Sequence, residues 1–133
     1  MRLAFNVAPP PPRRYDASME IHERHCDAPG VALLDLDGGL DHTTTAEFVE
    51  KMDRLLEAGR KHVILDLEHL SYASDWGLAA LERVHHHYTS QGGRIVFARL
   101  HSATAAILRV SHLARLFDLY PTIEDALREV VKV

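Results

Sequence analysis

The turn SDWG, residues Ser74–Gly77, combines residue types that could carry chemistry or recognition. It follows an apolar run and precedes a stretch with helical spacing, so it falls where a strand gives way to a helix. The first amide groups of a helix favour negative charge, which suits a carboxylate at Asp75 or a phosphate on Ser74. Both residues could also act only as helix caps. Trp76, the only tryptophan, could anchor a partner or fold back onto the core.

The segments around this turn alternate between strand and helix patterns. Apolar patterning predicts strands at residues 19–26, 31–38, 62–70, 94–100 and 118–120. Helical spacing predicts helices over residues 43–59, 75–91, 102–117 and 123–130. This order predicts a single-domain α/β sandwich, in which about four helices cover a mixed sheet of about five strands.

Several polar residues have structural interpretations. Thr44 with Glu47 predicts a capping box at the first helix, and Thr122 predicts the cap of the last helix. Asp35 and Asp37 are two residues apart on one predicted strand, so their side chains share a face of the sheet. We expect that face to be solvated, because no nucleophile or base accompanies the two acids in the sequence.

The composition predicts one soluble globular domain in the cytoplasm. The chain has 133 residues, of which 47% are hydrophobic and 26% charged, and a formal net charge of -4 argues against binding nucleic acid through a basic face. Cys26 is the only cysteine, which excludes an internal disulfide. No apolar run approaches the roughly 20 residues that span a membrane. The ten histidines lack the spacing of a structural zinc site, and no catalytic triad is evident, so we expect no metal, no cofactor and no enzymatic activity.

The first 17 residues differ from the rest. Pro9–Pro12 favour an extended polyproline conformation, and Arg13 and Arg14 follow them. We expect residues 1–17 to form a proline-rich tail that stands apart from a folded domain at residues 18–133.

Five segments in register, from about residue 20 to residue 131, resemble the STAS domain of bacterial anti-sigma factor antagonists. Residues 38–41 resemble the family's Gly-x-Leu-Asp segment, and residues 62–81 resemble its central strand, Asp-Ser-Ser-Gly loop and leucine-rich helix. Residues 92–100 and 108–127 fit the second half of the family pattern. The resemblance implies a STAS fold and a regulator that binds an anti-sigma factor, itself a serine kinase of the histidine-kinase-like ATPase type.

This sequence departs from the family pattern at the phosphorylated loop. With Gly77 as the anchor, the family's aspartate falls on Ser74, its phosphoacceptor serine on Asp75, and its small next residue on Trp76. Asp75 could imitate a phosphoserine, with a charge of about -1 against about -1.5 to -2, or remove the switch. Alternatively, Ser74 could be the acceptor, but a one-residue shift rotates the hydroxyl by about 100° around the helix. We favour loss of the usual switch and a constitutive binding module.

The resemblance also implies where a partner binds. The expected surface comes from the start of the first helix, the SDWG turn and the loop after the fourth strand: Asp41, Thr43, Ser74, Asp75, Trp76, Gly77 and Ser102. An alternative function is a STAS subunit that regulates a membrane transporter of the ABC lipid-transport or anion-transport type. A homodimer is a further option.

Overall fold

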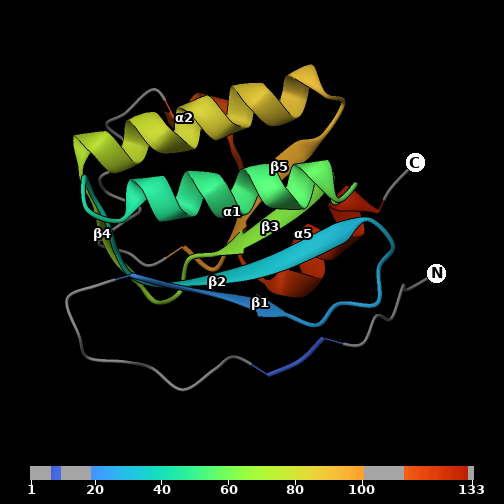
Figure 1. Ribbon diagram of the computed structural model, residues 1–133. Coiled ribbons are helices and arrows are strands. Elements are labelled where there is room, and N and C mark those ends of the chain that lie inside the picture. The colour runs from blue at the N-terminus through green and yellow to red at the C-terminus, as the bar shows by residue number, and fades with distance from the viewer. Residues whose placement is uncertain (1–6, 10–18, 101–112, 132–133) are drawn as a thin grey trace.

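The computed structural model describes residues 7–9, 19–100 and 113–131, and it has the predicted α/β class (Figure 1). The strands are β1 (Glu20–Arg24), β2 (Val31–Leu40), β3 (His62–Asp66), β4 (Leu70–Ala73), β5 (Arg94–Ala98) and β6 (Asp118–Tyr120). The described helices are α1 (Thr45–Glu57), α2 (Asp75–Ser90), α4 (Leu113–Leu116) and α5 (Ile123–Val130). Among these described residues, no helix has the length and hydrophobicity needed to cross a lipid bilayer.

The sheet is mixed, with the strand order β1-β2-β3-β5-β6. β1 pairs antiparallel with β2, whereas β2, β3, β5 and β6 run parallel to one another. The last residues of β2 pair with β4 after an irregularity between Gly38 and Gly39. Because parallel strands end at the same edge of a sheet, the loops after β2, β3 and β5 leave from one side of the molecule.

Helices α1 and α2 cover one face of the sheet, and α5 covers the other (Figure 1). Alternate residues of β2 explain the two layers, since successive side chains of a strand point to opposite faces. Leu34 and Leu36 pack with Phe48 and Met52 of α1 in one hydrophobic cluster. Leu33 points to the opposite face of the sheet, where it packs with residues of α5 in a second cluster. The alternation along β2 thus places one hydrophobic cluster on each face of the sheet.

Thr122 caps α5 as predicted, because its side-chain oxygen accepts a hydrogen bond from the Asp125 amide at 3.0 Å. The predicted Thr44–Glu47 capping box is wrong. The Thr44 hydroxyl is buried, where it accepts from the Asp41 amide at 3.0 Å and donates to the Gly39 carbonyl at 2.9 Å. Its hydrogen-bonding capacity is used by the turn that leads into α1, so it does not cap the helix.

The predicted strand at residues 62–70 is two strands. β3 ends at Asp66, and a turn closed by a hydrogen bond from the Leu70 amide to the Leu67 carbonyl leads into β4. The apolar run alone did not mark this break, because Leu67 and Leu70 are both buried. The predicted helix at residues 102–117 lies mostly outside the described residues, and only α4 of it is described.

The expectation of a solvated face around Asp35 and Asp37 is also wrong. Asp35, Asp37 and Asp66 are all buried, on the sheet face that carries Leu33. Arg24 donates to the Asp66 carboxylate at 2.8 Å, and Arg99 binds the same carboxylate through Nε at 3.1 Å. Burial raises the pKa of Asp35, and the nearby Asp66 carboxylate raises it further. The arginines that compensate this acidic cluster come from distant parts of the chain.

The described part of the proline-rich tail contacts the domain. Val7 forms a bridge with Cys26, and the Ala8 amide donates to the His25 carbonyl at 3.1 Å. The buried Arg24 guanidinium donates twice to the Ala8 carbonyl, at 2.8 and 3.0 Å. Residues 7–9 therefore do not stand apart as expected, while the boundary between residues 17 and 18 stays a prediction.

Candidate functional site

The end of β2 and the start of α2 are in direct contact. The Ser74 amide donates to the Leu40 carbonyl at 2.9 Å, and a methyl group added at Gly77 would lie only 2.3 Å from the same carbonyl oxygen. A glycine at position 77 is what allows this close approach. We use the term β2–α2 corner for the group of residues held together there: Asp41, Thr43, Tyr72 and Ser74–Gly77.

Ser74 is the N-cap of α2. Its backbone is extended, and its side-chain oxygen accepts a hydrogen bond from the Gly77 amide at 3.3 Å. The side chain is half-buried. The predicted strand-to-helix junction is confirmed, and the interpretation of Ser74 as a helix cap holds.

Asp75 and Trp76 are the first two residues of α2, and both are exposed. The Trp76 side chain is 69% exposed, compared with 41% for Tyr72 and 42% for Leu119. Trp76 therefore does not fold back onto the core. Asp75 makes no ion pair with another residue in the described part of the chain, and it lies where the amides of the first helical turn favour negative charge.

The Asp41 carboxylate is held by neutral donors. It accepts hydrogen bonds from the Thr43 hydroxyl at 2.6 Å, from the Thr43 amide at 2.8 Å and from the Tyr72 hydroxyl. These bonds, the Thr43 hydroxyl first, hold the pKa of Asp41 well below its usual range. The hydrogen bond from the Tyr72 hydroxyl to the Asp41 carboxylate raises the pKa of Tyr72. Asp41 is thus a fixed negative charge at the corner.

Tyr72 is a residue that the sequence did not identify as part of this site. Its ring lies against Gly39, where an added methyl group would be only 2.1 Å from the ring. Tyr72 lies two residues before Ser74. The sequence would have indicated that Tyr72 belongs to this site only if β4 had been recognised as a strand.

The family model of the STAS domain matches residues 24–126. The chain belongs to the STAS domain family. The fold of this STAS domain is similar to that of an anti-sigma factor antagonist from Mycobacterium paratuberculosis, with 21% identity, a TM-score of 0.74, and coverage of 89% of this chain and 98% of that one.

Two other solved structures show the same fold. The phosphorylated form of SpoIIAA, a Bacillus cell fate determinant, has 18% identity and a TM-score of 0.64, and the match covers 85% of this chain and 99% of that one. The murine anion transporter Slc26a9 has 18% identity and a TM-score of 0.67. That match covers 78% of this chain but 18% of the transporter, so this STAS domain corresponds to a small part of it.

The STAS domain brings together most of the residues predicted from its sequence. Those that meet at the β2–α2 corner are Asp41, Thr43, Ser74, Asp75, Trp76 and Gly77. Ser102 lies outside the described residues.

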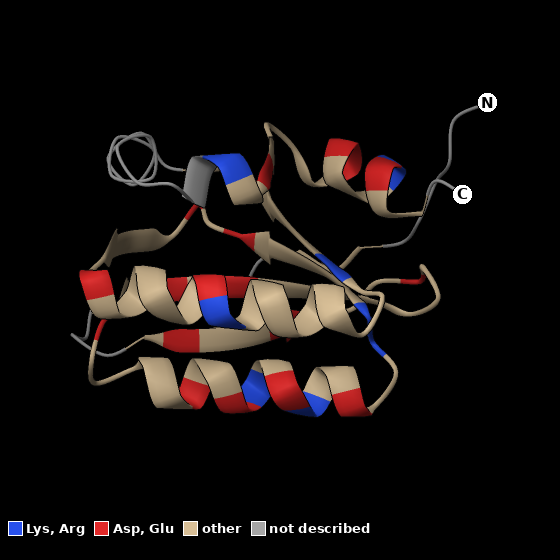
Figure 2. Cartoon of the chain, turned by 90° about the horizontal axis from the view of Figure 1, so that it is seen from above, with Lys and Arg blue, Asp and Glu red and all other residues tan. Residues whose placement is uncertain are grey.

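The segments that form the β2–α2 corner contain no basic residues. The sequence has no lysine or arginine between residues 36 and 50 or between residues 68 and 82. Arg60, Lys61 and Arg94 lie where β3 and β5 begin, at the other end of the sheet (Figure 2).

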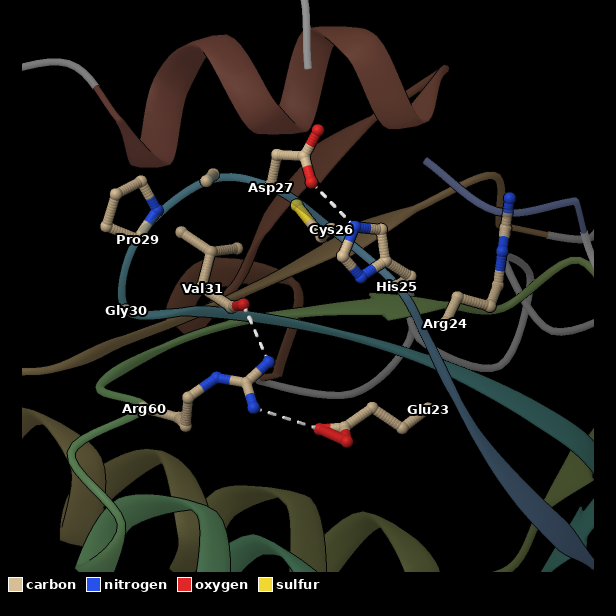
Figure 3. Close-up of a pocket in the computed structure, with 10 residues that line it drawn as sticks. Glu23, Arg24, His25, Cys26, Asp27, Pro29, Gly30, Val31 and Arg60 are labelled. Carbon is tan, nitrogen blue, oxygen red and sulfur yellow. Dashed lines mark hydrogen bonds and ion pairs between the residues drawn. The ribbon is translucent and has the colours of Figure 1, made fainter. Parts of the chain in front are cut away.

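A cavity of about 380 Å³ lies beside the turn between β1 and β2 (Figure 3). Arg60 donates there to the Val31 carbonyl at 2.9 Å and pairs with Glu23 at 3.2 Å, and His25 pairs with Asp27 at 2.6 Å. Since β2 spans roughly 33 Å, this cavity is far from the corner. Arg60 and His25 are thus paired with acids of the same cavity, whereas Arg24 is bound to Ala8 and Asp66. No group of three or more potential metal ligands occurs among the described residues.

Proposed function

We propose that this STAS domain is a cytoplasmic regulator of the anti-sigma factor antagonist type, which acts by binding and not by catalysis. Its β2–α2 corner docks onto an anti-sigma factor that is a serine kinase of the histidine-kinase-like ATPase type. The observation that carries the proposal is the 69% exposed Trp76, which follows Asp75 in the first turn of α2.

The exposure of Trp76 supports binding. Single exposed apolar side chains are common on protein surfaces. Here, however, a second exposed aromatic, Tyr72, and the fixed Asp41 carboxylate belong to the same corner. Tryptophan and tyrosine dominate the energetics of protein interfaces, where truncation of a central residue costs about 2 kcal/mol or more.

The contacts of Ser74 support a fixed binding state at the usual switch position. The resemblance places the family's acceptor serine on Asp75, which has no hydroxyl group to phosphorylate. Ser74 is half-buried and its oxygen caps α2, so a kinase would have to open this cap to reach the hydroxyl. Neither residue is thus set up as an ordinary phosphoacceptor.

A regulatory subunit of a membrane transporter is the second candidate function. The fold match to the murine anion transporter Slc26a9 favours it. A partner of the ABC lipid-transport or anion-transport type would then replace the anti-sigma factor.

Titration calorimetry with purified partners from the source genome tests the proposal. We expect the wild-type chain to bind an ATPase-type anti-sigma factor, and Trp76→Ala to weaken binding at least about 30-fold, which corresponds to about 2 kcal/mol. Leu119→Ala is the matched control, because Leu119 is an exposed apolar residue on β6 and should change the affinity less than about twofold.

Two results would overturn the anti-sigma factor proposal. One is the absence of binding to any such ATPase, combined with binding to a transporter protein, which would support the second candidate. The other is an equal affinity of the wild-type chain and Trp76→Ala, which would move the docking surface away from the corner.

A further inference from the structure

The strand β1 lies at the edge of the sheet, and the described residues cover its outer side only in part. It pairs with β2 alone, and the tail adds a single bridge. The Ala8 amide of the tail donates to the His25 carbonyl, which faces outward. Since main-chain groups alternate in direction along a strand, those of Ile21 and Glu23 face the same side. Such an edge can pair with another strand unless it is covered or blocked.

Prolines prevent the tail from completing this pairing itself. In the register of the Val7–Cys26 bridge, Pro10 would fall opposite Glu23. Pro12 would fall opposite Ile21, two positions further on. Proline has no amide proton, so it cannot donate a hydrogen bond to either carbonyl. The tail can therefore shield this edge without adding a full strand to it.

A buried arginine holds the tail against the domain. The Arg24 side chain is 8% exposed, and its Nη1 donates to the Asp66 carboxylate at 2.8 Å. Its Nε and Nη2 both donate to the Ala8 carbonyl, at 3.0 and 2.8 Å. Two such donors match the two oxygens of a carboxylate, which binds a guanidinium more strongly than a neutral carbonyl does. The seat of Ala8 can therefore accept an acidic side chain instead.

We propose that residues 7–9 are a displaceable guard of the β1 edge, and that β1 of a second copy of this chain pairs there when they leave. This inference does not depend on the proposed function. In an antiparallel pairing centred on His22, this residue lies opposite its own counterpart. Ile21 of each copy then lies opposite Glu23 of the other, so their outward main-chain groups can bond to one another.

The charges of β1 are complementary in this register. Glu20 of each copy lies opposite Arg24 of the other, and cross-strand pairs of opposite charge are stabilising. Glu20 now pairs with His22 at 2.9 Å. In the dimer its carboxylate would take the place of the Ala8 carbonyl on the Nε and Nη2 of Arg24. The buried guanidinium would thus keep an acceptor after the tail has left.

Sedimentation velocity on full-length variants tests the guard. Ala8→Pro removes the amide that donates to His25, and Val7→Asp places a charge on a side chain packed against the second hydrophobic cluster. The double variant should dimerise at least about tenfold more tightly than the wild-type chain, whose tethered tail competes with the second copy. Ala8→Ser is the matched control, because it keeps the amide and should sediment like the wild type.

A disulfide trap tests the register in the double variant. Each chain also carries Cys26→Ser, so that the introduced cysteine is the only one. In His22→Cys the two introduced residues would lie directly opposite each other, with about 4.5 Å between their Cα atoms, within reach of a disulfide. Oxidation should cross-link this chain at least about tenfold faster than Leu119→Cys, whose cysteine lies at an exposed position on β6.

Three results would overturn the inference. One is a folded double variant that is as monomeric as the wild-type chain. If circular dichroism shows that the double variant is unfolded, the milder Ala8→Pro alone is used for both measurements. The second is a wild-type chain that dimerises as tightly as the variant, because the tail would then guard nothing. The third is dimerisation with equal cross-linking of His22→Cys and Leu119→Cys, which would place the contact between copies away from β1.

Discussion

The substitution Gly77→Ala probes the contact that brings α2 against the end of β2. The added methyl carbon would lie 2.3 Å from the Leu40 carbonyl oxygen and 3.0 Å from the Leu40 carbonyl carbon. Ordinary contacts between carbon and oxygen are about 3.3 Å or longer, so the first turn of α2 would have to move by about 1 Å. The atoms that clash with the added methyl group belong to the Leu40 backbone, which cannot relieve the clash by a change of rotamer.

The magnitude follows from three effects. Overpacking costs about 1–3 kcal/mol, and weakening the hydrogen bond from the Ser74 amide to Leu40 adds about 0.5–1.5 kcal/mol. Alanine recovers about 1 kcal/mol through its better helix propensity. We expect Gly77→Ala to lower the free energy of unfolding by about 1–3 kcal/mol, measured by urea denaturation followed by far-UV circular dichroism, and to weaken partner binding by displacing the corner.

Gly92→Ala is a suitable control at the other end of the same helix. Gly92 has a φ of +77° and open space around its Cα, so alanine there costs about 1–2 kcal/mol through backbone strain without any clash. This variant should lose stability but keep its partner affinity. A Gly77→Ala protein as stable as the wild type, with unchanged affinity, would refute the close approach of α2 to β2.

Three further predictions concern groups that the fold holds in place. Arg24→Met removes one of the two arginines that bind the buried Asp66 and should cost about 3–5 kcal/mol in urea denaturation, whereas a cost below about 1 kcal/mol would contradict the buried cluster. Asp35 has a raised pKa, so the wild type should lose stability as the pH rises from 3.8 through the folded-state pKa. The Asp35→Asn variant has no carboxyl group to titrate at this position. Urea denaturation should therefore show that its stability relative to the wild type increases from pH 4 to pH 7. A constant difference between the two proteins would contradict the raised pKa. Tyr72→Phe removes a donor to Asp41, whose pKa should rise in a carbon-13 NMR titration, and an unchanged pKa would disprove that contact.

Local signals in the sequence were sufficient for the elements and for the junction at Ser74–Gly77. Thr122 and Ser74 cap their helices because a short polar side chain can bond to amides two or three residues ahead, and that geometry is local. The same rule failed at Thr44, whose hydroxyl is bonded to the turn at residues 39–41.

The missed features depend on contacts between distant segments. Asp66 is compensated by Arg24 and Arg99, which are 42 and 33 residues away, so none of its neighbours in the sequence indicates that this acid is buried. Tyr72 reaches Asp41 across 31 residues. That contact exists because β4 pairs with the end of β2, and a four-residue strand carries too little periodicity to be recognised.

The burial of Trp76 on complex formation tests the docking surface most directly. Trp76 is the only tryptophan, so a chain labelled with 5-fluorotryptophan gives a single fluorine-19 resonance even when an unlabelled partner is present. A soluble nitroxide should broaden this resonance strongly in the free chain, because the side chain is 69% exposed. With a saturating amount of the ATPase-type anti-sigma factor, we expect the broadening to fall at least about fivefold, since central interface residues are shielded from solvent. A complex in which the resonance broadens as much as in the free chain would show that the partner docks elsewhere.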